Sequence, residues 1–258
     1  MIVNAAQHPM GDDRLYITND GVVMLDGASS FEPVPVNTSD YVDALSDYLT
    51  DHLDPGTDLR TTLRDAISAT AVDLDLRPGR SPSSTVTIFR RTDDYAECLV
   101  LGDNLVALPD RTIIDDRMSE FGSHLRTRYQ QRLRDGHGWD GWHTQILQQL
   151  RAEQARHRNK PGGYWIAEAA PEAADHAIVI RASVSTVPWA VLATDGAYKV
   201  MTHLGLNTWP DLREATRLDL ERLLRDCQAW EGSEDPRGQR LPRAKPHDDK
   251  SLAVVKLQ

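Results

Sequence analysis

Short apolar segments separated by tight turns come in adjacent pairs, and this arrangement limits the folds open to the chain. Arg14 to Thr18 and Val22 to Leu25 flank Asn19-Asp20-Gly21, a strong signal for a β-hairpin. A β-meander pattern follows at Ser84 to Arg91, Ala96 to Leu101 and Leu105 to Leu108. Antiparallel neighbours need only short turns, whereas parallel strands need long crossovers. The sequence therefore predicts antiparallel sheets rather than a repeated βαβ unit.

Helical patterns also come in pairs. Asp40 to Leu53 and Asp58 to Leu76 each gather apolar residues on one face, and Ser39 is the predicted N-cap of the first. The polar, proline-containing stretch Glu231 to Pro246 is typical of an exposed loop. Further helices are expected at Gly196 to Leu204, at Asp211 to Ala229 and as two runs between Arg117 and Lys160. Further strands are expected at Ala177 to Ser183, Trp189 to Thr194 and Leu252 to Leu257.

Length and charge narrow the classes of protein. The 258 residues suffice for one large domain with a full core, and the absence of a long linker favours one domain over residues 1–258. The net charge of −10 argues against nonspecific binding of nucleic acid or anionic membranes. The start has no signal-peptide pattern, and Cys98 and Cys227 suggest buried, reduced thiols. We expect a monomeric cytoplasmic protein with neither nucleic acid nor membrane as a partner.

Four aspartates recur at the ends of predicted strands. Asp26 and Asp195 each end an apolar run and precede glycine, Asp103 follows Gly102, and Asp248 precedes the closing strand. Carboxylates that converge at a sheet edge repel one another unless a cation lies between them. Oxygen ligands without a cysteine pair favour Mg²⁺ or Mn²⁺ over Zn²⁺. The alternative is that Asp-Gly only turns the chain, and it stays open on these residues alone.

Six segments, in order along the chain, have counterparts in one family. They are GDDRLYI, GVVMLDGAS, SPSSTVTIFRR, CLVLGDNLVAL, WAVLATDGAY and HDDKSLAVVKL. They resemble, in the same order, the segments NEDxxxx, FAVxDGxGG, GSTAVxxx, xxVGDSRxxL, xxLLxSDGLxD and DNxTxxxxxx of the protein phosphatase 2C family. The order is kept from Gly11 to Leu257, so the chain resembles a bacterial-type member of these metal-dependent serine/threonine phosphatases.

The resemblance implies a fold and a reaction. The fold is α+β, a four-layer sandwich of two antiparallel β-sheets flanked by paired α-helices, with a variable helical flap at about residues 109–175. The reaction is hydrolysis of phosphoserine or phosphothreonine in a phosphorylated protein by a hydroxide bound at a binuclear Mn²⁺ or Mg²⁺ centre. Two alternatives remain open: a small-molecule phosphoester hydrolase on the same fold, and a catalytically weak regulatory or binding relative.

Site residues follow from the resemblance, position by position. Asp26 would bridge two divalent cations, the Gly27 carbonyl would bind one of them, and Asp195 and Asp248 the other. Together Asp26, Asp195 and Asp248 would be the catalytic residues, acting through metal-bound water. Asp103 matches the ligand of a weaker third cation. Metal-bound waters would be held by Asp12 and Asp13. A shift of one residue in the alignment with the family would replace Asp248 by Asp249 as the ligand.

Two positions depart from the family pattern. His8 stands where an arginine usually grips the substrate phosphate, and it could donate one hydrogen bond in its place, or an arginine from elsewhere could serve. Ala28 stands where many eukaryotic members have a histidine. The sequence Asp135-Gly136-His137-Gly138 imitates that motif, but no strand precedes it, so we expect a loop between two helices.

The predicted flap carries a cluster of basic residues. We hypothesise that it recruits a phosphorylated or acidic partner, and the alternative is a solvated helical face with i,i+4 pairs. Trp139, Trp142 and Trp165 are expected to form local core. The basic residues are Arg126, Arg128, Arg132, Arg134, Arg151, Arg156 and Arg158.

Overall fold

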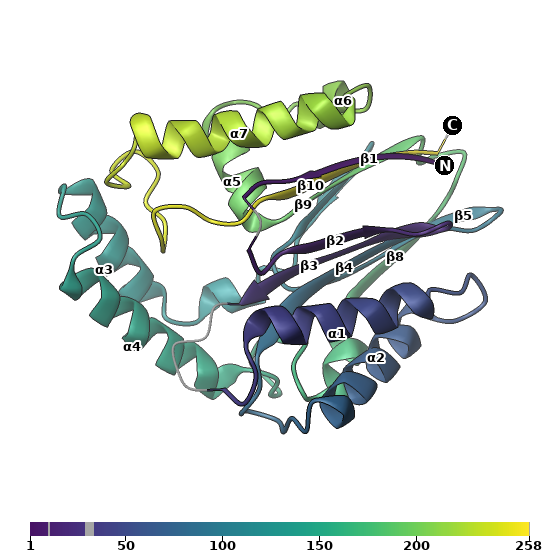
Figure 1. The fold of residues 1–258 in the computed structure, drawn as a ribbon, viewed down its shortest axis with the longest axis horizontal. Helices are drawn as coiled ribbons and strands as arrows, with labels where there is room; N and C mark the ends of the chain where they lie inside the picture. Colours follow the sequence, from purple (N-terminus) through teal and green to yellow (C-terminus); the bar gives the residue numbers. More distant parts are fainter. Residues whose placement is uncertain (10, 29–33, 258) are drawn as a thin grey trace.

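The computed structural model describes residues 1–9, 11–28 and 34–257. Its strands form two five-stranded antiparallel sheets that pack face to face (Figure 1). The first sheet has the order β1 (Ile2–Gln7), β10 (Ser251–Lys256), β9 (Trp189–Ala193), β6 (Leu105–Leu108) and β7 (Arg111–Ile113). The second has the order β2 (Arg14–Ile17), β3 (Gly21–Ala28), β4 (Ser83–Arg91), β5 (Tyr95–Leu101) and β8 (Ile178–Ser183).

Paired helices cover the outer face of each sheet. The helices α1 (Thr38–Asp51) and α2 (Leu59–Asp73) pack on the second sheet, and α5 (Asp195–His203) and α7 (Arg217–Ser233) pack on the first (Figure 1). Apolar residues of both sheets, Met24 and Leu192 among them, form the central layer. This is the four-layer α+β sandwich predicted from the sequence, and it is confirmed.

A third pair of helices, α3 (Ser123–Arg134) and α4 (Gly141–His157), lies beyond one end of the two sheets (Figure 1). The pair has a small apolar cluster of its own, which includes Tyr129, Leu133 and Ile146. Short 3₁₀ helices flank it at Arg117–Glu120 and Pro171–His176. The pair occupies the range in which a variable flap was expected.

Several local predictions are confirmed. The sequence Asp135-Gly136-His137-Gly138 connects α3 to α4, with positive φ at both glycines. Cys98 and Cys227 are buried and free. Trp165 belongs to a core cluster, and Trp139 packs against the helical pair, but Trp142 is 59% exposed, so its assignment to the core is wrong. Within the described residues, no helix is long and apolar enough to cross a membrane.

Helix boundaries differ from the predicted ones where side chains cap the backbone. Asn37, not Ser39, caps α1, because its side chain accepts a hydrogen bond from the backbone N–H of Asp40. The single helix predicted at Asp211 to Ala229 is two helices, α6 (Trp209–Leu212) and α7. A capping box between Thr216 and Asp219 starts the second one.

The stretch Glu231 to Pro246 is not simply an exposed loop. Helix α7 continues to Ser233, and Glu231 and Asp235 are almost fully buried. Arg243 folds back and donates a hydrogen bond to Asp235 at 2.7 Å. Buried charged partners hold this loop in place because an unpaired buried charge would be costly.

The edge strands β1 and β7 were not predicted. β1 pairs with β10 along its whole length, with Ala5 opposite Ala253. The sequence of β1, Ile-Val-Asn-Ala-Ala-Gln, lacks the apolar alternation that reveals a strand, and only one of its residues is buried.

Candidate active site

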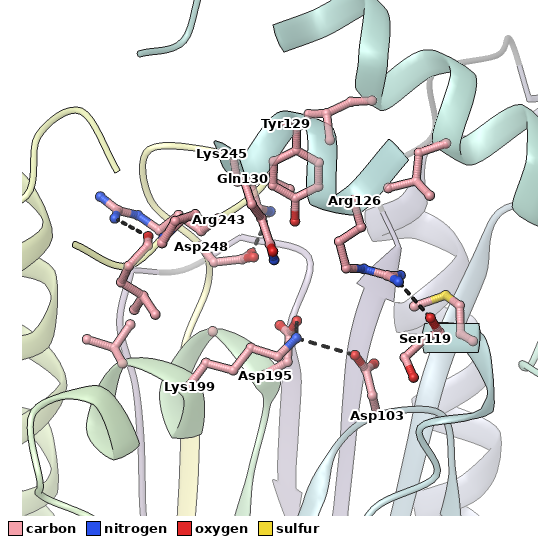
Figure 2. A pocket seen from close by; sticks show the side chains of 18 of the residues that line it. Asp103, Ser119, Arg126, Tyr129, Gln130, Asp195, Lys199, Arg243, Lys245 and Asp248 are labelled. Carbon is pink, nitrogen blue, oxygen red and sulfur yellow. Dashed lines mark hydrogen bonds and ion pairs between the residues drawn. The ribbon is translucent and has the colours of Figure 1, made fainter. Parts of the chain in front are cut away.

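The four strand-end aspartates lie at the end of the sandwich that faces the helical pair. Asp26 is in β3, and Asp195 begins α5 directly after β9. Asp248 precedes β10, which pairs with β9, and Asp103 lies in the turn between β5 and β6. Figure 2 shows Asp103, Asp195 and Asp248 on the walls of one pocket. The aspartates therefore come from both sheets to one end of the fold, as the sequence predicted for strand ends.

The backbone is packed closely at the end of the second sheet that carries Asp26 and Asp103. Asp26 lies opposite Thr85 of β4, and its backbone N–H donates to Thr85 Oγ1 at 3.1 Å. Gly102 has a φ of +91°, and a side chain there would meet Thr85 Cγ2 at 2.6 Å. A Cβ at Gly27 would lie 2.7 Å from both Asp12 Cβ and Thr38 Cγ2. Glycine is therefore required at both positions for the backbone to approach so closely.

Burial and the charges of neighbouring aspartates raise the pKa values of Asp26, Asp103 and Asp248. Burial is the main reason that the pKa of Asp26 lies well above its ordinary value, and the charges of Asp13, Asp195, Asp248 and Asp103 add to it. Burial and then the charge of Asp195 raise the pKa of Asp248 to about 6. Carboxylates under such mutual repulsion are suited to binding a cation.

Two lysines lie within the same group of aspartates. Lys199 Nζ is 2.6 Å from Asp195 Oδ2 and 3.5 Å from Asp103 Oδ2 (Figure 2). Lys245 Nζ is 2.6 Å from Asp248 Oδ1. Burial raises the pKa of Asp195, but the charge and hydrogen bond of Lys199 outweigh it and leave the pKa below its ordinary value. Sequence reasoning missed both lysines, although the i,i+4 spacing of Asp195 and Lys199 was a signal for the first.

The neighbouring acidic residues have structural partners. Asp13 is buried and accepts hydrogen bonds from Thr194 Oγ1 at 2.9 Å and Ser251 Oγ at 2.8 Å, which connects it to the N-cap of α5 and to β10. Burial is the main cause that raises the pKa of Asp13 to about 8. Asp12 and Asp249 meet through the Asp12 backbone N–H, which donates to Asp249 Oδ2 at 2.6 Å.

Asp248 and Asp249 face different surroundings. Asp248 lines the two large cavities described below, whereas the Asp249 carboxylate lies against Gly11 and Asp12. His8 follows β1, and its backbone N–H donates to the Lys250 carbonyl at 2.8 Å. His8 is not among the described residues that line either cavity. Its position gives no support to a role in gripping phosphate.

Two adjoining cavities open between the aspartates and the helical pair. Their volumes are about 430 and 310 Å³, and both are lined by Asp103, Asp195 and Asp248. Asp26 and Gly27 line the smaller one. The opposite walls carry apolar side chains, among them Met118 and Leu147 of the flap region.

Three arginines of the basic cluster line these cavities. Arg126 of α3 lines the larger one, Arg158 the smaller one, and Arg151 of α4 both. Arg126 Nη1 donates to the Ser119 carbonyl at 2.7 Å (Figure 2). Burial lowers the pKa of Arg151 to about 10, and the charge of Asp248 opposes that shift. The other members of the cluster that are exposed are Arg128, Arg134 and Arg156.

No known protein-family model matches the sequence, and no curated protein matches it significantly. Solved structures match over the whole chain. PppA of Pseudomonas aeruginosa, described as a key regulatory component of T6SS, matches with 14% identity and a TM-score of 0.56, over 99% of this chain and 98% of its own. The Mycobacterium tuberculosis serine/threonine phosphatase PstP/Ppp matches with 14% identity and a TM-score of 0.52, over 100% of both chains.

The chain has the protein phosphatase 2C fold. A further match with this fold is the catalytic domain of PstP in complex with 2 manganese ions, with 12% identity and a TM-score of 0.50, over 98% of this chain and 97% of its own. The fold predicted by the resemblance is thereby confirmed, and the roles of individual residues remain predictions.

The chemistry of the site fits a hard divalent cation. All the candidate side-chain ligands are carboxylates, the class of ligand that Mg²⁺ and Mn²⁺ prefer. The charges of the other three aspartates add to the effect of burial in raising the pKa of Asp26. Within the described part of the chain, however, no three His, Cys, Asp or Glu side chains are gathered closely enough to hold an ion as they stand. Instead, Lys199 and Lys245 form ion pairs with carboxylate oxygens of three of the aspartates.

Proposed function

We propose that the chain is a metal-dependent phosphatase that hydrolyses phosphoserine or phosphothreonine in proteins. The observation that carries the proposal is the meeting of Asp26, Asp103, Asp195 and Asp248 at one end of the fold. Bacterial serine/threonine phosphatases share that fold, and one of them is described as a complex with 2 manganese ions. Proteins with the fold at this level of identity differ in function, so the residues of the site carry the argument.

Asp26, the Gly27 carbonyl, Asp195 and Asp248 would hold two Mn²⁺ or Mg²⁺ ions. Asp103 would bind a weaker third ion, and Asp12 and Asp13 would hold waters of the ions. When bound, such ions supply Lewis acidity and lower the pKa of a coordinated water to near neutrality. The chain's contribution is to hold these oxygens at the end of rigid strands.

Arginines of the helical pair would bind and orient the phosphate. Arg126 and Arg151 line the larger cavity together with Asp195, so a phosphorylated side chain in it would lie between the arginines and the aspartates. A guanidinium forms strong charge-assisted hydrogen bonds to phosphate oxygens. This would compensate for His8, which does not line the cavities. The apolar wall at Met118 and Leu147 would contact the residues that flank the phosphorylated one and exclude water.

A second candidate function is a regulatory or binding relative with weak catalysis. The ion pairs of Lys199 and Lys245 with the site aspartates favour it, because they neutralise carboxylates that the proposed ions need. A small phosphoester as the substrate is the third possibility, which the cavity volume of about 430 Å³ accommodates.

The test compares hydrolysis of an aryl phosphate and of phosphothreonine peptides, with Mn²⁺ and with a chelator. Asp26→Ala and Asp195→Ala should abolish the metal-dependent turnover, and Asp226→Ala on the exposed side of α7 should not. Peptide turnover lost in both site variants supports the proposal. Turnover of the aryl phosphate alone indicates a small substrate. Metal binding without any turnover indicates a binding relative and contradicts the proposal.

A further inference from the structure

We propose that Lys199 and Lys245 are internal counter-ions of the aspartate site, which a divalent cation must displace, so that they weaken metal binding by this chain. The inference rests on the proposed metal-dependent function and concerns the regulation of the same site. It assigns to the two lysines a competing role: each ammonium group neutralises the site when the ion is absent.

Lys199 is held among the aspartates by helix α5. Asp195 is the first residue of that helix, and Lys199 follows one turn later on the same face. Its ammonium group reaches Asp195 Oδ2 at 2.6 Å and Asp103 Oδ2 at 3.5 Å. It therefore connects an aspartate of the first sheet's helix to the turn between β5 and β6, where a cation shared by the two carboxylates would lie.

Lys245 approaches the site from the other side. It lies between Pro242 and Pro246 in the loop before β10, and its ammonium group is 2.6 Å from Asp248 Oδ1. Arg243 pins the same loop through hydrogen bonds to Asp235. Three of the four strand-end aspartates thus have a lysine partner.

An ammonium group and a metal ion cannot share one carboxylate oxygen without strong repulsion, since both are cations within a few ångströms. Metal loading therefore requires the lysine side chains to swing away. Lys199 is 49% exposed and Lys245 40% exposed on the side chain, so solvent is available to receive them. Removal of a lysine has two opposite consequences: the metal-free protein loses a counter-ion, and the metal gains free oxygens.

The test measures Mn²⁺ binding to the purified chain by titration calorimetry, with thermal unfolding in parallel. Lys199→Met frees two carboxylates and should lower the Kd for Mn²⁺ by about fivefold, and Lys245→Met by about threefold. Both variants should melt at a lower temperature than the wild type in chelator and gain more from Mn²⁺. Lys199→Arg, which keeps the charge, should retain weak binding. Lys256→Met on β10, which removes an ion pair to Glu214, is the matched control and should leave the Kd unchanged.

Saturable Mn²⁺ binding with equal Kd values in the wild type, Lys199→Met and Lys245→Met overturns the inference and leaves the proposed function intact. No binding at millimolar Mn²⁺ by any of these proteins overturns both. If Lys199→Met does not fold in chelator, Lys199→Gln is measured in its place, and recovery of folding of either variant on addition of Mn²⁺ supports the inference.

Discussion

The Nζ atom of Lys250, which is fully buried, lies 2.8 Å from Glu231 Oε2. The same ammonium group donates to the Asp248 carbonyl at 2.9 Å. It thereby joins helix α7 to the backbone of a candidate ligand. A buried charge pair at this place fixes the position of Asp248 relative to α7.

Lys250→Met should destabilise the protein by about 3 to 5 kcal/mol, because it leaves the Glu231 carboxylate buried without its main partner. Urea unfolding followed by circular dichroism measures this as a lower midpoint. The double variant Lys250→Met/Glu231→Leu should recover part of the loss, since no charge is then left buried. An unchanged midpoint in Lys250→Met would show that Arg243 and His247, which also face Glu231, suffice.

Arg126→Gln should raise the KM for a phosphothreonine peptide by about fivefold and leave kcat nearly unchanged. The reason is that Arg126 lines the larger cavity and would act by binding the substrate phosphate through its positive charge. Steady-state kinetics measures the two constants. Arg128→Gln, on the exposed face of the same helix, is the control. Equal KM values for both variants would contradict the role of Arg126.

Much of the fold is readable from local signals in the sequence. The hairpin around Asn19-Asp20-Gly21 and the turn at Gly102-Asp103-Asn104 are both present, because short turns depend on the residues that form them. The Asp103 and Asp195 carboxylates could be placed at strand ends for the same reason. β1 could not be found, since its register comes from β10, more than two hundred residues away in the sequence.

Lys245 could be assigned as a charge partner of the site only from the three-dimensional structure, whereas the i,i+4 spacing of Asp195 and Lys199 is visible in the sequence. The sequence places Lys245 only three residues before Asp248, but the path of the loop between them depends on Arg243 and Asp235, which are joined by a hydrogen bond. For His8, a contact with the substrate phosphate stays a prediction from the sequence pattern, and neither of the two cavities is lined by it.

Thr216→Ala should destabilise the protein by about 1 kcal/mol, because α7 loses the capping hydrogen bond that separates it from α6. Thr216 Oγ1 accepts from the Asp219 backbone N–H at 3.3 Å, and Asp219 Oδ2 accepts from the Thr216 N–H at 3.0 Å. Thr216→Ser should preserve stability within about 0.5 kcal/mol as the conservative control. Urea unfolding measures the free energy of unfolding of both variants. Equal losses of stability in the two would mean that the threonine methyl group, and not the cap, is responsible.

The loop that carries Lys245 should lose stability in acid through Asp235. Burial raises the pKa of Asp235, but the backbone N–H groups of Arg240 and Leu241 and the guanidinium of Arg243 outweigh it and hold the pKa below its ordinary value. A carboxylate whose pKa is lower in the folded state stabilises the protein above its unfolded pKa of about 3.9, and this contribution is lost as the pH falls through the folded value.

Asp235→Asn should therefore reduce the free energy of unfolding at pH 7 and make it less dependent on pH below about 4. Urea unfolding at several pH values between neutrality and acid measures both effects. Asp226→Asn, exposed on α7, is the control and should follow the wild type. If the wild type and Asp235→Asn lose stability in parallel as the pH falls, Asp235 is not a source of the acid sensitivity. The wild type should lose more, because in it protonation also releases Arg243 from a carboxylate that is 2% exposed.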